Sequence, residues 1–127
     1  MGAEKLTHAI QAAKLGLAVL PVHSIKDGRC TCGIVDCASP GKHPVADLVP
    51  NGVKQASKDP EQILEWWMQR EDANIGIATG AVSNLYVLDV DPRHGGIDSL
   101  AKLEQENGAL PATWVVDTGG GGSHYLF

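Results

Sequence analysis

Two aspartates stand two residues apart at the end of the apolar segment LYVLDVD: Asp89 and Asp91. Because side chains alternate along a strand, both carboxylates share one face with Leu85 and Val87. That face begins apolar and ends charged, as expected where a strand leaves the core and enters a cleft. Carboxylates this close repel each other unless a cation lies between them. The pair therefore predicts a Mg²⁺ or Mn²⁺ site for phosphoryl transfer. A solvated strand end or turn has the same short pattern.

All three cysteines of the chain lie within eight residues, and a histidine follows them in the order Cys30, Cys32, Cys37 and His43. An odd, tightly clustered set of thiols argues against a disulfide framework and favours a metal site. Three thiolates and one imidazole suit tetrahedral Zn²⁺, and four protein ligands leave no position for water, so this zinc would be structural. The alternatives are three free cysteines in a loop, or His23 as a ligand.

Four consecutive glycines, Gly119 to Gly122, precede the segment SHYLF. Their backbone amides could surround a phosphate. His124 follows on the next expected strand, where it could contact a nucleotide phosphate or assist proton movement. A flexible hairpin turn with a half-buried histidine is the alternative. Lys42 is a candidate for contact with DNA or a triphosphate, although a solvated lysine is the commoner case.

Composition restricts the class of protein. The chain has 127 residues, of which 43% are hydrophobic and 20% charged, and its net charge is −5. This acidic balance argues against a protein that holds nucleic acid by bulk charge alone. It is compatible with an enzyme whose carboxylates hold metal ions. Because the sequence has neither a membrane-spanning apolar run nor a signal peptide pattern, we expect a cytoplasmic protein without membrane contact.

Periodicity and turn residues predict the elements that position these groups. The segment 24–58 is rich in Gly, Pro, Asp and Lys and is expected to be an irregular loop that zinc organises. Asp59 and Pro60 are a strong helix start. The expected helices are 4–15, 60–70 and 97–107, and the expected strands are 17–22, 74–80, 85–91, 113–118 and 123–127.

The adjacent Trp66 and Trp67 point about 100° apart on the second of these helices. One is expected to pack in the core with Ile63, and the other to be partly exposed. Packing in the core or in an interface is the favoured role of the pair, and stacking on a nucleic acid base is the alternative.

The order of the segments is more specific than any one of them. It runs LGLAVLPV, a cysteine-rich loop ending in SPGKHP, DPEQILEWW, ANIGIATG, LYVLDVD, GGIDSLAKLE and LPATWVVDTGGGGSHYLF. In this order the chain resembles the N-terminal domain of bifunctional DNA primase–polymerases of the archaeo-eukaryotic primase superfamily, as found in phage and plasmid replication proteins. The resemblance covers nearly the whole chain.

The resemblance implies an α+β fold, in which an N-terminal α/β unit packs on an RRM-like unit. Residues 1–127 would form one catalytic domain that is incomplete at its C-terminus, because the family continues with further strands and usually a third acidic residue. A helicase domain often follows in such proteins. The Cys30, Cys32, Cys37 and His43 loop would correspond to a zinc-binding insertion of some members.

The resemblance also assigns roles in template-directed nucleotidyl transfer. Asp89 and Asp91 match the family's metal-binding acidic motif. His124 matches its nucleotide-contacting histidine. The partners would be a DNA template and primer together with dNTPs or NTPs. The residues expected to hold the triphosphate are Gly121, Gly122, Ser123, His124 and Lys42.

Two other classes of function remain open on the same residues. A metal-dependent nuclease or phosphodiesterase would use a similar pair of carboxylates, since two-metal sites serve both reactions. A zinc-containing module that binds DNA or protein without catalysis would need only the Cys and His cluster. Degradation of DNA without nucleotides would favour the first class, and salt-dependent DNA binding without incorporation would favour the second.

Overall fold

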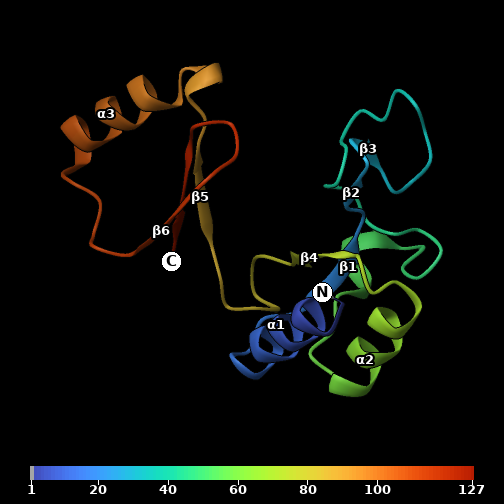
Figure 1. The fold of residues 1–127 in the computed structure, drawn as a ribbon. Helices are drawn as coiled ribbons and strands as arrows, with labels where there is room; N and C mark the ends of the chain where they lie inside the picture. Colours follow the sequence, from blue (N-terminus) through green and yellow to red (C-terminus); the bar gives the residue numbers. More distant parts are fainter. Residues whose placement is uncertain (1) are drawn as a thin grey trace. The chain divides into compact units, whose positions relative to one another are not determined.

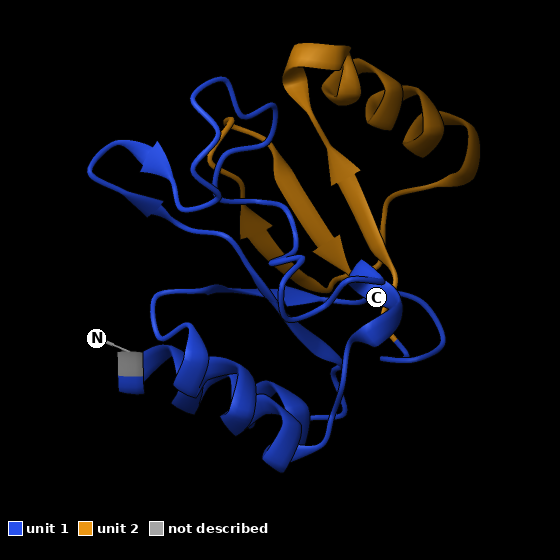
Figure 2. Cartoon of the chain, turned by 90° about the vertical axis from the view of Figure 1, so that its right-hand side faces the viewer, with its two compact units in different colours: residues 1–84 blue, residues 85–127 orange. Residues whose placement is uncertain are grey.

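The computed structural model describes residues 2–127, which form two compact units. The first unit comprises Met1–Asn84 and the second Leu85–Phe127 (Figure 2). Within residues 2–127, the first unit has two α-helices and two small antiparallel sheets, and the second has one α-helix and one antiparallel sheet. The Cys and His cluster belongs to the first unit, and the acidic pair with the glycine run belongs to the second.

The first unit is built on two helices and a two-stranded sheet (Figure 1). Strand β1 (Val19–Val22) pairs antiparallel with β4 (Asn74–Ile77). Helix α1 (Gly2–Lys14) packs against α2 (Pro60–Gln69), and both helices contact β1. The predicted start of α2 is confirmed, because the Asp59 side chain accepts a hydrogen bond from the Glu61 amide at 3.1 Å and Pro60 occupies the first turn. The hydrophobic core lies between these elements.

Both tryptophans of α2 are buried in that core. Trp66 is 4% exposed and Trp67 is 2% exposed, and Ile63 beside them is completely buried. The indole Nε1 of Trp67 donates to the carbonyl of Ala73 at 3.1 Å, which satisfies its only polar group. The expectation that one tryptophan is partly exposed is wrong, and core packing is confirmed. The pair has no free ring face for a nucleic acid base.

Few regular elements lie between β1 and α2. Strands β2 (Ile25–Lys26) and β3 (Arg29–Cys30) form a short hairpin, and a single 3₁₀ turn, η1 (Gly52–Gln55), follows much later. Val45 and Val49 attach the segment to the first unit, since both are 1% exposed. Most of this stretch therefore has no ladder or helix to fix its backbone, and Cys32 and Cys37 lie where such support is missing.

The second unit is a three-stranded antiparallel sheet with one helix. Strand β7 (Ser123–Leu126) lies between β5 (Val87–Val90) and β6 (Trp114–Asp117). Helix α3 (Gly96–Asn107) packs against β5, and the 3₁₀ turn η2 (Pro92–His94) connects the two. The sheet register pairs Asp89 with His124 and His124 with Val116. One face of this sheet therefore carries an acid and a histidine side by side.

The mixture of three helices and small antiparallel sheets within residues 2–127 confirms the α+β class. None of these helices combines the length and the apolar character that crossing a bilayer requires.

Candidate functional site

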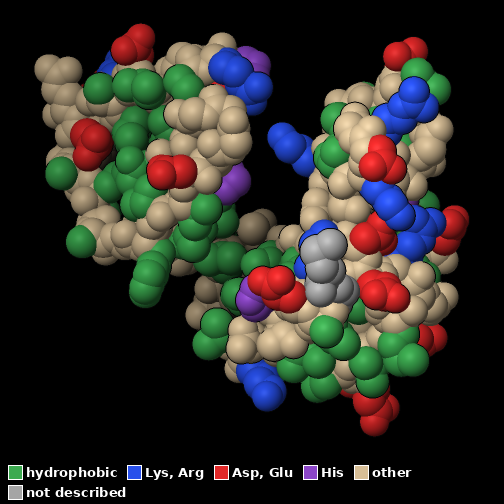
Figure 3. All heavy atoms as spheres, viewed as in Figure 1, with side chains coloured by type: hydrophobic (Ala, Val, Ile, Leu, Met, Phe, Trp, Pro, Cys, Tyr) green, Lys and Arg blue, Asp and Glu red, His purple; other side chains and the backbone are tan. Residues whose placement is uncertain are grey.

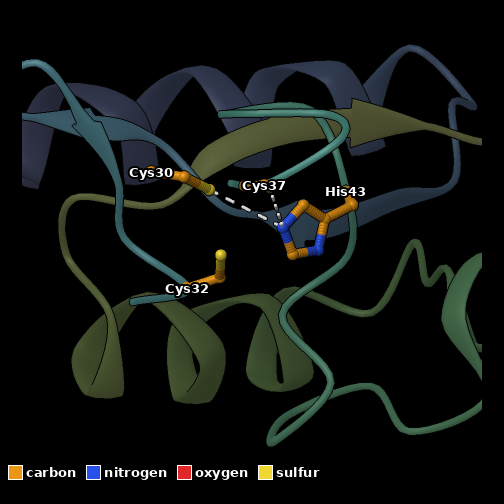
Figure 4. Close-up of side chains that lie close together, drawn as sticks. All are labelled: Cys30, Cys32, Cys37 and His43. Carbon is orange, nitrogen blue, oxygen red and sulfur yellow. Dashed lines mark hydrogen bonds between the residues drawn. The ribbon is translucent and has the colours of Figure 1, made fainter. Parts of the chain in front are cut away.

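The structure brings the four predicted zinc ligands together. Cys30 lies at the end of β3, and Cys32, Cys37 and His43 follow in the loop. One ligand atom from each residue lies within 4.8 Å of the others, and the side chains converge on one point (Figure 4). The Nε2 atom of His43 is 3.6 Å from Cys30 Sγ and 3.4 Å from Cys37 Sγ. The spacing noted in the sequence thus produces a single Cys₃His group.

These distances fit a tetrahedral zinc site. Zn–S bonds of about 2.3 Å and Zn–N bonds of about 2.0–2.1 Å at tetrahedral angles hold a sulfur and a nitrogen about 3.5 Å apart. The two Nε2–Sγ distances in the structure, 3.6 and 3.4 Å, bracket that value. The donor set is also the one that zinc prefers. A Cys₃His cluster in this chain could therefore hold zinc.

The backbone around the cluster favours a thiolate at Cys30. The amide of Gly41 donates to Cys30 Sγ at 3.3 Å, and this hydrogen bond is the main cause that lowers the pKa of Cys30 to about 6. Burial, in contrast, raises the pKa of the neighbouring Cys37 thiol. A thiolate is the form that binds metal, so Cys30 is already in the ligand state at neutral pH.

His23 is not a member of the group but supports it. Its ring packs on the ring of His43, with centroids 4.6 Å apart, and its amide donates to the His43 carbonyl at 2.8 Å. The Nδ1 atom of His23 contacts Thr31 Oγ1 at 2.8 Å, and Asn74 Nδ2 donates to the carbonyls of His23 and Gly41. The core-facing end of the loop is therefore held in place by β1 and β4. His23 is therefore not one of the four grouped ligands, but it contacts the ligand His43.

The structure also brings together two of the three predicted catalytic residues. Asp89 on β5 lies opposite His124 on β7, and His124 Nε2 is 3.4 Å from Asp89 Oδ1. Both side chains are accessible, with 63% of the Asp89 side chain and 42% of the His124 side chain exposed. The acid and the imidazole therefore both lie open to solvent on this sheet.

Asp91 continues the extended backbone of β5 by one residue but is engaged by its own chain. Its carboxylate accepts hydrogen bonds from Arg93 Nε and Nη2, each at 3.2 Å, and contacts His94 Nδ1 at 3.0 Å. The Arg93 amide also donates to Asp91 Oδ1 at 2.9 Å. These bonds from Arg93 hold the pKa of the Asp91 carboxyl well below its usual range. Asp91 is thus ionised and paired, whereas Asp89 faces solvent and His124.

The glycine run closes the hairpin between β6 and β7. The Gly121 amide donates to the Thr118 carbonyl at 3.1 Å, and the Gly122 amide donates to Thr118 Oγ1 at 3.0 Å. Gly122 is buried against β5, where a Cβ atom would come within 2.3 Å of the Val90 carbonyl oxygen. Gly122 therefore allows close packing of the sheet, and both predicted amides already have acceptors. Ser123 follows as the first residue of β7.

Lys42 is exposed in the loop of the first unit, whereas the acidic pair belongs to the second unit. Its contact with a nucleotide stays a prediction. The first unit also has an open pocket of about 880 Å³, which α1, β2 and the segment after α2 line. None of the predicted site residues lines this pocket, and its wall mixes both charges, with Lys5, Lys26 and Arg70 beside Glu4 and Asp72.

Sequence reasoning did not single out Arg93 or Thr118. The signal for Arg93 was present in DPRHGG, because an aspartate before a turn commonly accepts a hydrogen bond from the amide two residues later. That turn places the arginine side chain beside the carboxylate. Thr118 precedes the four glycines directly, and a hydroxyl there can satisfy amides that a glycine turn leaves free.

Comparison with known proteins gives one finding. The family model described as bifunctional DNA primase/polymerase, N-terminal, matches residues 9–127. No curated protein and no solved structure gave a significant match. Because the match covers the acidic pair, the glycine hairpin, His124 and the Cys₃His loop, the chain belongs to the family of bifunctional DNA primase/polymerase N-terminal domains.

Proposed function

We propose that this chain is the catalytic domain of a DNA primase–polymerase that performs template-directed, divalent-metal-dependent nucleotidyl transfer in phage or plasmid replication. Its substrates are a DNA template with a growing primer and dNTPs or NTPs, and it works in the cytoplasm. We infer that a helicase domain in the parent protein is a partner. The family supports the primase–polymerase class of activity. The residues of the second unit support the details.

One observation carries the proposal. Asp89 and His124 lie 3.4 Å apart on an accessible sheet face, and Asp91 follows two residues after Asp89 on extended backbone. A carboxylate pair with an adjacent imidazole offers ligands for Mg²⁺ or Mn²⁺ on one side and a donor for a phosphate on the other. If the two acids only ended a strand in solvent, no histidine would be needed opposite Asp89 on the neighbouring strand.

The carboxylates of Asp89 and Asp91 would hold Mg²⁺ or Mn²⁺. When bound, such ions stabilise charge on the attacking and leaving oxygens of phosphoryl transfer. His124 would donate to a phosphate oxygen of the incoming nucleotide while remaining next to Asp89. Ser123 and the backbone of Gly121 and Gly122 would border the triphosphate, although the two amides must first leave Thr118. Lys42 is proposed separately as a residue that contacts DNA or a triphosphate.

The Cys₃His group has a structural role in this proposal. With zinc bound, Cys30, Cys32, Cys37 and His43 would fix a loop that has little regular structure of its own. A fixed loop in a nucleic acid enzyme can guide the template or the primer. The loop follows β1 and His23, and β1 pairs with β4 in the first unit. Order in the loop is therefore coupled to the core of that unit.

The test compares primer synthesis and primer extension by the protein and by the double variant Asp89→Ala plus Asp91→Ala. We expect a loss of at least about a hundredfold in rate, because the groups that stabilise transition-state charge are removed. Asp98→Ala, an exposed acid on α3, is the matched control and keeps the activity. Undiminished synthesis by the double variant would exclude the assignment. Degradation of DNA without nucleotides would indicate a nuclease instead.

A further inference from the structure

Arg93 lies directly beside the acidic pair. Its guanidinium forms a two-pronged contact with Asp91, from Nε to Oδ1 and from Nη2 to Oδ2, each at 3.2 Å. On its other side lies the glycine turn, where a Cβ atom at Gly120 would be 3.0 Å from Arg93 Nη2. The arginine therefore lies between the carboxylate and the hairpin that leads to His124.

The arrangement creates a competition at Asp91. A divalent cation at the acidic pair needs lone pairs of the Asp91 carboxylate, and both of its oxygens already accept bonds from Arg93. The Arg93 side chain is 67% exposed and the Asp91 side chain is 26% exposed, so the ion pair borders solvent and can exchange its partners. Once the carboxylate turns to a cation, the five donors of the guanidinium need a new acceptor.

A phosphate is the acceptor that the chemistry supplies at that point. Mg²⁺ in such sites is typically bound by one or two carboxylates and by the phosphates of the substrate. A phosphate oxygen on an ion at Asp91 is therefore a neighbour of any group that touches the Asp91 carboxylate. The guanidinium fork matches phosphate geometry as well as it matches a carboxylate. Because Gly120 has no side chain, the guanidinium lies directly against the glycine turn.

We propose that Arg93 is a triphosphate-binding residue that neutralises Asp91 in the metal-free protein and passes to the phosphates of the nucleotide when Asp91 holds a divalent cation. This inference rests on the proposed function, because it requires Asp91 to be a metal ligand. Arg93, which the sequence did not single out, would then bind two partners in succession, first the Asp91 carboxylate and then the phosphates. This role also explains why the chain keeps a strong cation beside a carboxylate that must bind another cation.

The inference predicts effects of opposite sign from one substitution, which a merely structural role of Arg93 would not give. In Arg93→Ala, Asp91 loses its competitor, so Mn²⁺ alone should bind about two- to fivefold more tightly, the range for an exposed ion pair. In the same variant, dATP with saturating Mg²⁺ should bind about tenfold or more weakly, because charge-assisted hydrogen bonds to phosphate are lost. Arg93→Lys should lie between, since it keeps the charge and loses the fork.

The experiment measures free Mn²⁺ by electron paramagnetic resonance during titration of the full chain, and then binding of a fluorescent dATP analogue. Inorganic tripolyphosphate serves as competitor, because it tests recognition of phosphates without a base. Lys102→Ala on α3 removes an exposed charge of the same unit and is the matched control, for which neither affinity should change. Circular dichroism verifies that each variant is folded.

The possible outcomes separate the two levels of the proposal. Tighter Mn²⁺ binding together with weaker triphosphate binding in Arg93→Ala supports the inference. Unchanged or weaker Mn²⁺ binding, or unchanged triphosphate binding, in a protein that binds both ligands overturns the role of Arg93 and leaves the proposed function intact. Wild-type protein that binds no Mn²⁺ sensitive to Asp91→Ala overturns the proposed function, and the role of Arg93 with it.

Discussion

The two candidate metal sites of this chain differ in what their ligands do without metal. In the Cys₃His cluster, Nε2 of His43 faces two thiols at 3.4 and 3.6 Å, so the donors already have the spacing of a filled site. At the acidic pair, Asp91 is held by Arg93 and His94, and Asp89 by His124. The donors of the first site face one another, whereas the carboxylates of the second already have partners within their own unit.

The units that contain these two sites also differ in how many hydrophobic side chains they bury. Among the described residues, every buried hydrophobic side chain except Val90 belongs to the first unit. In the second unit, hydrophobic side chains reach the surface over much of the sheet (Figure 3), and Trp114 is 81% exposed. A site that must keep its ion benefits from a rigid core beneath it, whereas a site that takes and releases substrate needs access. The Cys₃His cluster therefore belongs to the unit with the buried core, and the acidic pair belongs to the unit with the exposed sheet.

The prediction with the largest expected effect on this comparison concerns zinc binding. The protein should contain one zinc per chain by elemental analysis, and Cys30→Ser should weaken zinc binding by more than about a hundredfold, since even groups that only orient a ligand contribute about 10–100-fold. Hydrogen exchange should then rise in residues 23–58, which have few backbone ladders of their own.

Asp36→Ala, an exposed acid of the same loop, is the control and should keep its zinc. Protection in the second unit should not change, because none of its residues contributes to the cluster. A protein that binds no zinc, or whose loop is equally protected with and without it, would remove the distinction between the two sites.

The next effect concerns the glycine hairpin. Gly122→Ala places a methyl group 2.3 Å from the Val90 carbonyl oxygen, a backbone atom that cannot yield without opening the sheet. We expect a loss of about 2–3 kcal/mol in the free energy of unfolding of the second unit. Gly119→Ala is the matched control, because the space around Gly119 is open, and its effect should stay within about 0.5 kcal/mol. Chemical denaturation followed by fluorescence measures both, and equal effects would contradict the role of Gly122 in sheet packing.

The sequence predicted the positions of most elements because their signals are local. Asp59 and Pro60 mark the start of α2, and the segment around Val87 alternates as a strand does. The Cys₃His cluster was predictable for a similar reason, because thiols so near in sequence need little chain folding to meet. The α+β class was predicted from the family resemblance, and the structure and the family match support it.

What the sequence did not predict depends on contacts made by particular side chains. Periodicity gives the direction of Trp66 and Trp67 on α2 but not what covers them. Both are buried because α1 lies against α2 and the chain returns to give Trp67 the Ala73 carbonyl. The pairing of Arg93 with Asp91 was also not predicted, because it requires the geometry of η2 and the close approach of the guanidinium to Gly120.

A prediction with a smaller expected effect compares the same substitution at one tryptophan from each unit. Trp67→Phe removes the hydrogen bond to the Ala73 carbonyl and leaves a cavity in the core, so it should lower the free energy of unfolding of the first unit by about 1–3 kcal/mol. Trp114→Phe is the same substitution at a side chain that is 81% exposed, and it should change stability by less than about 0.5 kcal/mol. Thermal unfolding of both variants tests this. A Trp114→Phe variant as destabilised as Trp67→Phe would mean that the sheet face of the second unit is covered in solution.

The smallest effect is a difference in stability at acid pH that comes from Asp91. Hydrogen bonds from the Arg93 side chain and amide hold the Asp91 pKa below its usual range, so the folded protein binds a proton there less readily than the unfolded chain does. The contribution of this pair to stability is therefore fully present above the ordinary aspartate pKa of about 3.9 and is lost as the pH falls below it. Asp91→Asn has no such carboxyl, so its unfolding midpoint should fall less than that of the wild type between about pH 4 and pH 2. Asp98→Asn, with an exposed acid that lies outside this network, should follow the wild type. If the unfolding midpoints of the wild type and Asp91→Asn fell in parallel with pH, Arg93 would not hold Asp91 in solution. The carboxylates of the acidic pair would then have no competitor for a cation, as the zinc ligands have none.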